Sequence, residues 1–315
     1  MSRFDNYPDP DRDIPEDLRA GKLKIDPETI SERAEQLAKS PDTEIIQAEG
    51  SWFKIDGVSV PASHRAGKDE NQDQMIVFAK PDENFFLAGV FDGVGGKAGG
   101  RQAAETFKTE ILTAVQMAVL RKFGSAEIYH AIQGGIKRAQ TKIKTLGPEY
   151  QSADTTISLM YGMEVKLDTG EKQLKIFTMH TGDSRIYRFR NSQKTQITAD
   201  QSPVEELKID PLEAKLHPRK NEVYSTAMHP DFKYYSQNPQ PQDVYLLNTD
   251  GFSDQFREDA NLDEIQNMLG QEASALNMAS TARVRFEQKT RLSKNDDVTI
   301  IRVIIKNPPK KTYTT

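Results

Sequence analysis

The stretch FFLAGVFDGVGGKAGG, residues 85–100, joins an apolar segment to an acidic turn and a run of glycines. Residues 85–91 are all apolar or small, which predicts a buried β-strand. The strand ends abruptly at Asp92-Gly93, and residues 93–100 contain five glycines, more than an ordinary turn requires. A buried strand that leads directly into an aspartate and then into a segment with few side chains points to a site at the strand end.

Other aspartates stand at the ends of predicted strands. Asp250-Gly251 follows the apolar segment VYLLNT, Asp73 directly precedes a predicted strand, and so do Asp296 and Asp297. Neighbouring antiparallel strands run in opposite directions, so the end of one lies beside the start of the next. Carboxylates that are far apart in the sequence can therefore gather at one edge of a sheet.

Clustered carboxylates repel one another unless cations neutralise them. Sets of oxygen ligands suit Mg²⁺ or Mn²⁺, and two such ions about 3.5–4 Å apart can activate a shared water. A glycine after each aspartate would let a backbone carbonyl reach a metal and would leave room for a phosphate. Taken singly, each Asp-Gly pair is more typical of a simple turn. The glycine-rich segment also lacks the Walker and GxGxxG patterns of nucleotide-binding loops.

The amino-acid composition narrows the possible functional classes of the protein. The chain has 315 residues, a net charge of −5 and no cysteine. The acidic balance argues against nucleic-acid binding by phosphate neutralisation. The lack of cysteine excludes disulfides, thiolate zinc sites and a cysteine nucleophile. No secretory signal and no run of ~18 apolar residues is present. We therefore expect a soluble cytoplasmic protein without a membrane partner, and a monomer because no heptad pattern is seen.

The order of predicted elements favours an α+β fold over a doubly wound one, because helices come in blocks rather than after each strand. We expect helices at 101–121, 126–145 and about 261–288, and a hairpin turn at Gly182-Asp183. Residues 1–45 are predicted to be a partly ordered N-terminal arm, with a capping box at residues 29–32. Residues 46–308 form the main domain, with a flap at about 199–240, and 309–315 form a C-terminal tail.

Seven segments together carry a family resemblance: residues 71–73 (NQD), 90–96 (VFDGVGG), 154–159 (DTTISL), 181–189 (TGDSRIYRF), 197–202 (ITADQS), 243–254 (DVYLLNTDGFSD) and 295–303 (NDDVTIIRV). In this order they resemble the metal-dependent protein phosphatases, the PPM or type 2C serine/threonine phosphatases, in a bacterial-like branch. The resemblance covers about residues 52–305. It implies two packed antiparallel β-sheets flanked by pairs of helices, in four α-β-β-α layers.

The resemblance also implies an activity and a ligand set. The activity is hydrolysis of phosphoserine and phosphothreonine in protein substrates, with two Mn²⁺ or Mg²⁺ ions and attack by a metal-bridging hydroxide. Asp92 would bridge both ions, and Gly93 would supply its carbonyl. Asp250 and Asp296 would complete the other side, and Asp73 would act directly or through water.

The expected third-metal aspartate falls on Gln151, with Asp154 nearby, so a third ion is left open. Lys68 stands where many members have a phosphate-binding arginine, and Arg65 could reach the phosphate instead. His64 is a candidate general acid because Val94 stands where many eukaryotic members have a histidine, although a lone histidine more often has a surface or packing role.

Three interpretations remain at this point. The first is an active two-metal phosphatase. The second is a pseudophosphatase, a binding module that keeps the fold without turnover; Gln72 and Lys68 depart from the family pattern, whereas all four candidate ligand aspartates are present. The third is another two-metal hydrolase such as a nuclease, which the acidic balance disfavours. Asp183, Arg185 and Asp200 are expected to have structural roles.

Overall fold

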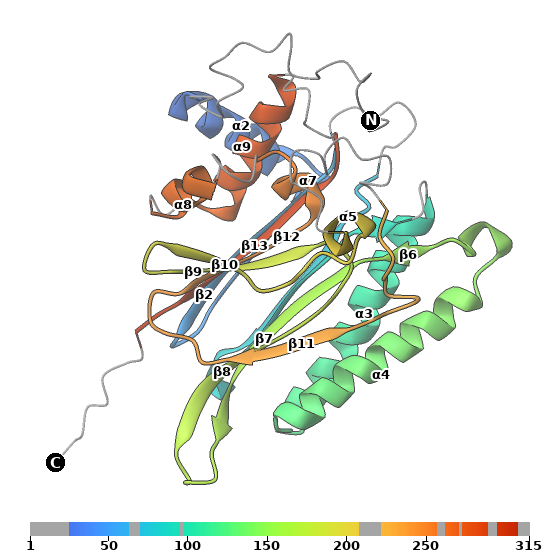
Figure 1. Cartoon of the computed structure of the whole chain (residues 1–315), viewed down its shortest axis with the longest axis vertical. Coiled ribbons are helices and arrows are strands. Elements are labelled where there is room, and N and C mark those ends of the chain that lie inside the picture. The colour runs from blue at the N-terminus through green and yellow to red at the C-terminus, as the bar shows by residue number, and fades with distance from the viewer. Residues whose placement is uncertain are drawn as a thin grey trace, which may run out of the picture.

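A computed structural model describes residues 25–62, 70–94, 98–207, 222–256, 262–270, 273–288 and 295–307. Two antiparallel sheets pack against each other, and helices cover their outer faces (Figure 1). The predicted α+β fold with two antiparallel sheets and flanking helices is confirmed. None of the described helices is long and apolar enough to cross a membrane.

The strands of the six-stranded sheet lie in the order β1 (Glu44–Glu49), β2 (Phe53–Val60), β13 (Val298–Ile305), β12 (Val244–Asn248), β9 (Arg185–Arg190) and β10 (Gln193–Gln196). Those of the five-stranded sheet lie in the order β11 (Lys233–Gln237), β8 (Lys172–Thr181), β7 (Ile157–Lys166), β4 (Phe85–Phe91) and β3 (Gln74–Lys80). A short ribbon pairs β5 (Gly93–Val94) with β6 (Asp154–Thr155).

The described helices are α2 (Pro27–Lys39), α3 (Ala98–Leu120), α4 (Ser125–Lys144), α5 (Pro203–Glu206), α7 (Asp250–Ser253), α8 (Leu262–Gly270) and α9 (Ala275–Glu287). The 3₁₀ turns are Pro81–Glu83 and Pro148–Tyr150. Helices α3 and α4 cover the five-stranded sheet, while α2, α8 and α9 lie on the six-stranded sheet (Figure 1). The predicted helical stretches thus correspond to α3, α4 and the pair α8–α9.

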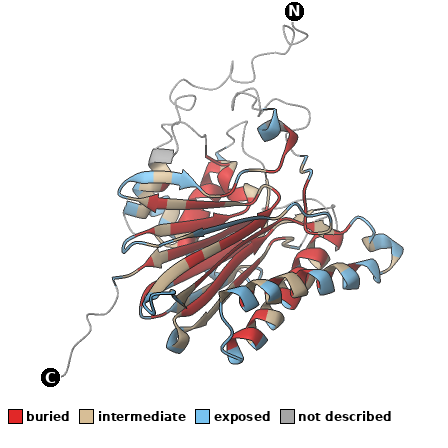
Figure 2. Ribbon diagram, turned by 60° about the horizontal axis from the view of Figure 1, so that its bottom comes forward, coloured by how far each residue is buried: buried red, intermediate tan, exposed pale blue. Residues whose placement is uncertain are grey.

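Strand β4 is buried on both faces because it lies between two cores. Phe86 and Val90 point into the core between the sheets, whereas Phe85, Leu87 and Phe91 point toward α3 and α4. A third core lies between the six-stranded sheet and its helices. Figure 2 shows the strands buried along most of their length and the outer faces of the helices exposed. The uninterrupted apolar run in the sequence therefore reflects two different packing layers.

Part of the predicted N-terminal arm is built into the sheet and its helical cover. β1 pairs with β2 as an edge strand, and Arg33 of α2 forms an ion pair with Glu287 of α9. Asp26 caps α2 by accepting a hydrogen bond from the Glu28 amide, so the helix begins two residues before the predicted capping box. The boundary at residue 45 stays a prediction.

The predicted hairpin at Gly182-Asp183 is wrong. β8 belongs to the five-stranded sheet and β9 to the six-stranded sheet, so the turn carries the chain from one sheet to the other. Gly182 has φ +104°, a left-handed conformation that favours glycine. Alternating apolar residues show which face of a strand is buried, but they do not show which sheet it joins. In the predicted flap, α5 and β11 are described, and residues 208–221 lie outside the described part.

Helices α3 and α4 approach closely at Gly135. A Cβ atom there would lie 2.8 Å from the Glu110 carbonyl oxygen and 2.8 Å from the Ile111 Cα, and neither backbone atom can move aside easily. At the adjacent Gly134, a Cβ atom would meet only the end of the Arg138 side chain, at 3.4 Å. The two glycines therefore have different tolerance for a side chain.

We expect Gly135→Ala to lower the free energy of unfolding by about 1–3 kcal/mol, because an added methyl group would force the helices apart. Gly134→Ala should raise it by about 0.5–1 kcal/mol, because alanine has the higher helix propensity. Urea denaturation of the two variants measures the difference. Equal effects of both changes would contradict the close approach of the helices.

Candidate metal centre

The ends of β3 and β4 bring Asp73 and Asp92 to the same edge of the five-stranded sheet. These strands pair antiparallel with Gln74 opposite Phe91, so Asp73 precedes one strand where Asp92 follows the other. A Cβ atom on Gly93 would lie 2.7 Å from the Gln72 carbonyl oxygen, which shows how closely the two segments pass. The antiparallel argument from the sequence holds for this pair.

The six-stranded sheet brings Asp250 and Asp296 together in the same way. β12 pairs with β13, and the register continues past the strand end because the Thr249 amide donates to the Thr299 carbonyl oxygen at 3.1 Å. A Cβ atom on Gly251 would lie 1.8 Å from the Asp297 carbonyl oxygen and 3.2 Å from the Asp296 Cβ. Glycine is required at this position because the two segments are in direct backbone contact.

One hydrogen bond joins the two pairs of aspartates across the sheets. The Thr249 hydroxyl donates to Oδ2 of Asp73 at 2.7 Å, and Asp73 is only 2% exposed. Thr249 directly precedes Asp250, so Asp73 of one sheet lies beside the Asp250 segment of the other. We call the edge formed by Asp73, Asp92, Asp250 and Asp296 the acidic rim.

Electrostatics confirm that the acidic rim is crowded. Burial raises the pKa of Asp92 well above its ordinary value, and the negative charges of Asp250, Asp73, Asp296 and Asp183 raise it further. Asp183 belongs to the sheet-crossing turn, so this turn also brings negative charge toward the rim. Such crowding costs free energy unless a cation compensates it.

The pKa of Asp73 is also raised, first by burial and then by Asp297, while the hydrogen bond from Thr249 opposes the rise. Asp73 is therefore a carboxyl group whose ionised form is disfavoured in its present surroundings. A divalent cation at the rim would reverse this preference by favouring the charged form.

The donor set of the acidic rim fits a hard divalent ion. It offers carboxylate oxygens, which Mg²⁺ and Mn²⁺ prefer. Within the described ranges, no three His, Asp or Glu side chains converge tightly enough to complete a metal site as they stand. Repulsion between carboxylates opposes closer approach until a cation neutralises them. The donor set therefore suits a hard divalent cation, and the predicted number of ions and assignment of individual ligands stay predictions.

Two threonines that the sequence analysis left without a role hold Asp92 in place. The Asp92 carbonyl oxygen accepts from the Thr156 amide at 2.9 Å and from the Thr155 hydroxyl at 2.8 Å. The Asp92 amide donates to Oγ1 of Thr156 at 3.2 Å, and this oxygen is paired with the Ser184 hydroxyl. The DTTISL segment signalled their importance, but their function depends on contacts across 63 and 64 positions.

The glycines after Asp92 have a packing role. A Cβ atom on Gly93 would lie 2.5 Å from the Gly100 carbonyl carbon, and one on Gly100 would lie 2.6 Å from the Gly93 carbonyl oxygen. The first turn of α3 thus rests directly on the backbone that follows Asp92. For Gly93 and Gly100, contact between two backbone segments is sufficient reason for glycine, besides any room left for substrate.

Asp154, the residue near the expected third-metal position, is engaged in hydrogen bonds. Its Oδ1 accepts from the amides of Thr155 at 2.8 Å and Met228 at 3.0 Å, and its Oδ2 accepts from the Thr226 hydroxyl at 2.5 Å. Asp154 therefore ties residues 226–228 to the ribbon beside Asp92. Gln151 is exposed, and the question of a third ion stays open.

The remaining predicted residues divide into two groups. His64, Arg65 and Lys68 lie outside the described residues. Asp200 accepts two hydrogen bonds from Nε of Arg185, at 2.9 and 3.0 Å, and one from Nη2 at 2.6 Å, which confirms the expected structural hydrogen bond.

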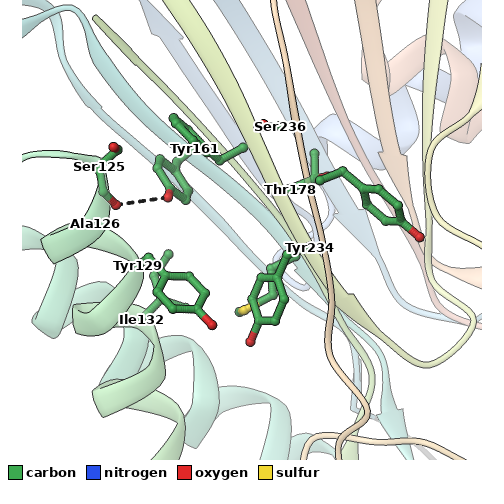
Figure 3. A pocket seen from close by; sticks show the side chains of 11 residues that line it. Ser125, Ala126, Tyr129, Ile132, Tyr161, Thr178, Tyr234 and Ser236 are labelled. Atoms are coloured by element: carbon green, nitrogen blue, oxygen red, sulfur yellow. Dashed lines mark hydrogen bonds between the residues drawn. The ribbon is translucent and has the colours of Figure 1, made fainter. Parts of the chain in front are cut away.

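A separate cleft of about 440 Å³ lies between α4 and strands β7, β8 and β11 (Figure 3). Tyr129 and Tyr234 meet edge to face there with ring centroids 4.9 Å apart, and Tyr161 stacks on Phe177 at 4.8 Å. Its lining contains no acid, base or residue of the acidic rim. A large aromatic cleft is a common default for a binding site, but this one lacks the groups that hydrolysis requires.

Removing one rim carboxylate should stabilise the metal-free protein. Because the pKa of Asp92 is raised, the folded state binds more protons than the unfolded state above pH ~4, so stability falls as pH rises through that range. Asp92→Asn should remove this loss of folding stability, which amounts to about 1.4 kcal/mol for each unit by which the pKa is raised.

Urea denaturation in EDTA from pH 4 to pH 8 tests this expectation. The variant should be more stable than the parent at pH 8, with the difference shrinking toward pH 4. Asp82→Asn, an exposed position just after the far end of β3, serves as the control and should leave the profile unchanged. A less stable Asp92→Asn at pH 8 would contradict carboxylate crowding.

Comparisons with known proteins find relatives that are serine/threonine phosphatases. No family model matches the chain. The serine/threonine protein phosphatase PstP of Mycobacterium tuberculosis is 26% identical over 207 residues, which is 62% of this chain and 38% of that protein. The chain therefore matches well under half the length of this curated relative.

Solved structures share the fold at low sequence identity. The phosphatase Stp1 of Staphylococcus aureus has a TM-score of 0.64 at 21% identity, covering 83% of this chain and 100% of that one. The serine/threonine phosphatase of S. agalactiae has a TM-score of 0.63 at 22% identity, covering 81% of this chain and 100% of that one. The catalytic domain of PstP in complex with two manganese ions has a TM-score of 0.57 at 21% identity, covering 81% of this chain and 99% of that one. The chain thus has the fold of bacterial serine/threonine phosphatases, and the resemblance to the PPM family that its motifs indicate is confirmed.

Proposed function

We propose that this chain is a metal-dependent protein phosphatase that hydrolyses phosphoserine and phosphothreonine. The observation that supports this most directly is the acidic rim, where two sheets bring Asp73, Asp92, Asp250 and Asp296 together. The likeness to PstP adds support, since that relative is a serine/threonine protein phosphatase.

Two Mn²⁺ or Mg²⁺ ions would be held by the rim. Asp92 is central because its carboxylate interacts with those of Asp73, Asp250 and Asp296, which suits a bridging role. Gly93 would add its carbonyl oxygen. When bound, the ions supply Lewis-acid activation of water and neutralisation of the phosphoryl charge. Thr155 and Thr156 keep Asp92 aligned, so the chain fixes the central ligand before a substrate arrives.

The substrate phosphate would be recognised by basic residues of the segment before β3. Lys68 is assigned as the main phosphate contact and Arg65 as its alternative, and His64 is the candidate proton donor to the leaving group. A lysine binds phosphate as a point charge rather than as a planar fork, so Lys68 would contribute attraction more than orientation. The substrates would be phosphorylated proteins. The enzyme would act as a monomer in the cytoplasm.

A pseudophosphatase is the competing interpretation, and turnover separates the two. After removal of divalent ions, we expect hydrolysis of p-nitrophenyl phosphate and of a phosphothreonine peptide only when Mn²⁺ is added. Asp92→Asn and Asp250→Asn should each lower kcat by about 10³-fold or more, as loss of a central catalytic group does. Asp82→Asn, remote from the rim, should retain full activity. A parent protein that binds Mn²⁺ without turnover would favour the binding module.

Lys68→Ala tests the phosphate contact separately. Losing one charge-assisted hydrogen bond should raise KM for the phosphopeptide about tenfold, with a smaller effect on kcat. Lys166→Ala removes an exposed lysine at the end of β7 away from the rim and should leave KM unchanged. An unchanged KM in Lys68→Ala would reject this role for Lys68.

A further inference from the structure

The connection from β2 to β3 passes from one sheet to the other beside the acidic rim, and one carboxylate holds both of its described ends. Oδ1 of Asp297 accepts from the Ala62 amide at 2.7 Å, and Oδ2 accepts from the Gln72 amide at 2.8 Å. Asp297 is 8% exposed, so these hydrogen bonds are shielded from water. The side chain thus fixes the separation between residues 62 and 72.

A buried arginine of α9 contacts the start of the same connection. Arg283 is 3% exposed, and its Nη2 donates to the carbonyl oxygens of Val60, at 3.1 Å, and Pro61. Burial lowers the pKa of Arg283 to about 10, which leaves it cationic at neutral pH. Of the neighbouring charges, Asp297 acts on it most strongly, so the arginine is a counter-charge for this carboxylate.

The hydrogen bonds lead from Asp297 to a candidate metal ligand. Gln72 directly precedes Asp73, whose amide donates to Oδ1 of Asn71 at 3.0 Å. Asn71 in turn donates to the Ser59 hydroxyl of β2 at 2.8 Å. The backbone of Asp73 is therefore held from the β2 side, while Thr249 holds its carboxylate from the other.

Asp297 has the geometry of a support rather than of a ligand. Each of its oxygens already accepts a backbone amide, and turning it toward an ion would release residues 62 and 72. Its neighbour Asp296 is the residue that interacts with Asp92. Residues that orient metal ligands through hydrogen bonds commonly alter metal affinity without touching the ion.

We propose that Asp297, with Arg283 as its counter-charge, is a positioning residue that sets Asp73 in the metal centre by clamping the two ends of the β2–β3 connection. The proposal rests on the metal site of the proposed function. It assigns to Asp297 a role in metal affinity, and none in direct coordination or in the chemical step.

Asp297→Asn is the decisive variant because an amide keeps one acceptor oxygen and presents a donor to the second backbone amide. One end of the connection is then released with little change in volume. Isothermal titration with Mn²⁺ should show a dissociation constant about tenfold higher and the same number of bound ions. Activity should recover at saturating Mn²⁺, so that kcat is retained.

Asp243→Asn is the matched control. Asp243 is also buried and accepts from a backbone amide, that of Gln240, and from Arg190, but it precedes β12 at the end away from the rim. This variant should lose stability without any change in Mn²⁺ affinity. Arg283→Lys provides a second variant of the clamp, which keeps the charge, loses the contacts of the guanidinium with the Val60 and Pro61 carbonyls and should weaken Mn²⁺ binding in the same direction.

Three results with the variants would overturn the proposal. These are an unchanged Mn²⁺ affinity in both clamp variants, a loss of one bound ion in Asp297→Asn, which would make it a ligand, and an equal loss of affinity in Asp243→Asn. A parent protein that binds no Mn²⁺ would also overturn it. If the parent binds Mn²⁺ and the clamp variants bind it more weakly, the proposal stands even when no phosphatase activity is found, and only the proposed function fails.

Discussion

Repulsion between aspartates at the meeting edge of two sheets is the constraint around which this structure is arranged. Asp92 has its pKa raised both by burial and by the neighbouring carboxylates. A protein tolerates such a cluster only when stability elsewhere offsets it. Here three apolar cores, one between the sheets and one under each helical layer, provide that stability. The rim is therefore a locally unfavourable region built on a well-packed framework.

The framework also fixes the rim in position, because its groups stand at strand ends rather than on long loops. Asp56 of β2 illustrates how the layers are tied together. Its Oδ1 accepts from Arg302 of β13 at 2.8 Å, and its Oδ2 accepts from the Ala275 amide at the start of α9 at 2.6 Å. The helix that carries Arg283 is thereby fastened to the sheet. Strand β2 thus holds both the helix that carries Arg283 and β13, which Asp297 directly precedes.

The sequence predicted the parts that follow from local pattern. A continuous apolar run identified β4, and antiparallel geometry sufficed to bring Asp92 beside Asp73. Local pattern does not reveal partners that are distant in sequence. The hydrogen bond between Asp297 and Ala62 spans 235 positions. The strands before and after Gly182 show the same alternation of apolar residues, although they belong to different sheets. A glycine in the sequence does not reveal its own cause. A close backbone contact, as at Gly93, requires the same residue as a space left for a ligand.

The energetic cost of the acidic rim also bears on why the chain keeps it. A module that used only its fold to bind a partner would be more stable with Asn or Thr at the rim, because uncharged side chains could fill the same positions without mutual repulsion. Asp73 is 2% exposed, so it contributes little to any surface that a partner could touch. Crowded carboxylates with oxygen-only chemistry gain stability from divalent cations. Retaining them together is therefore better explained by cation chemistry at the rim than by recognition through the fold alone.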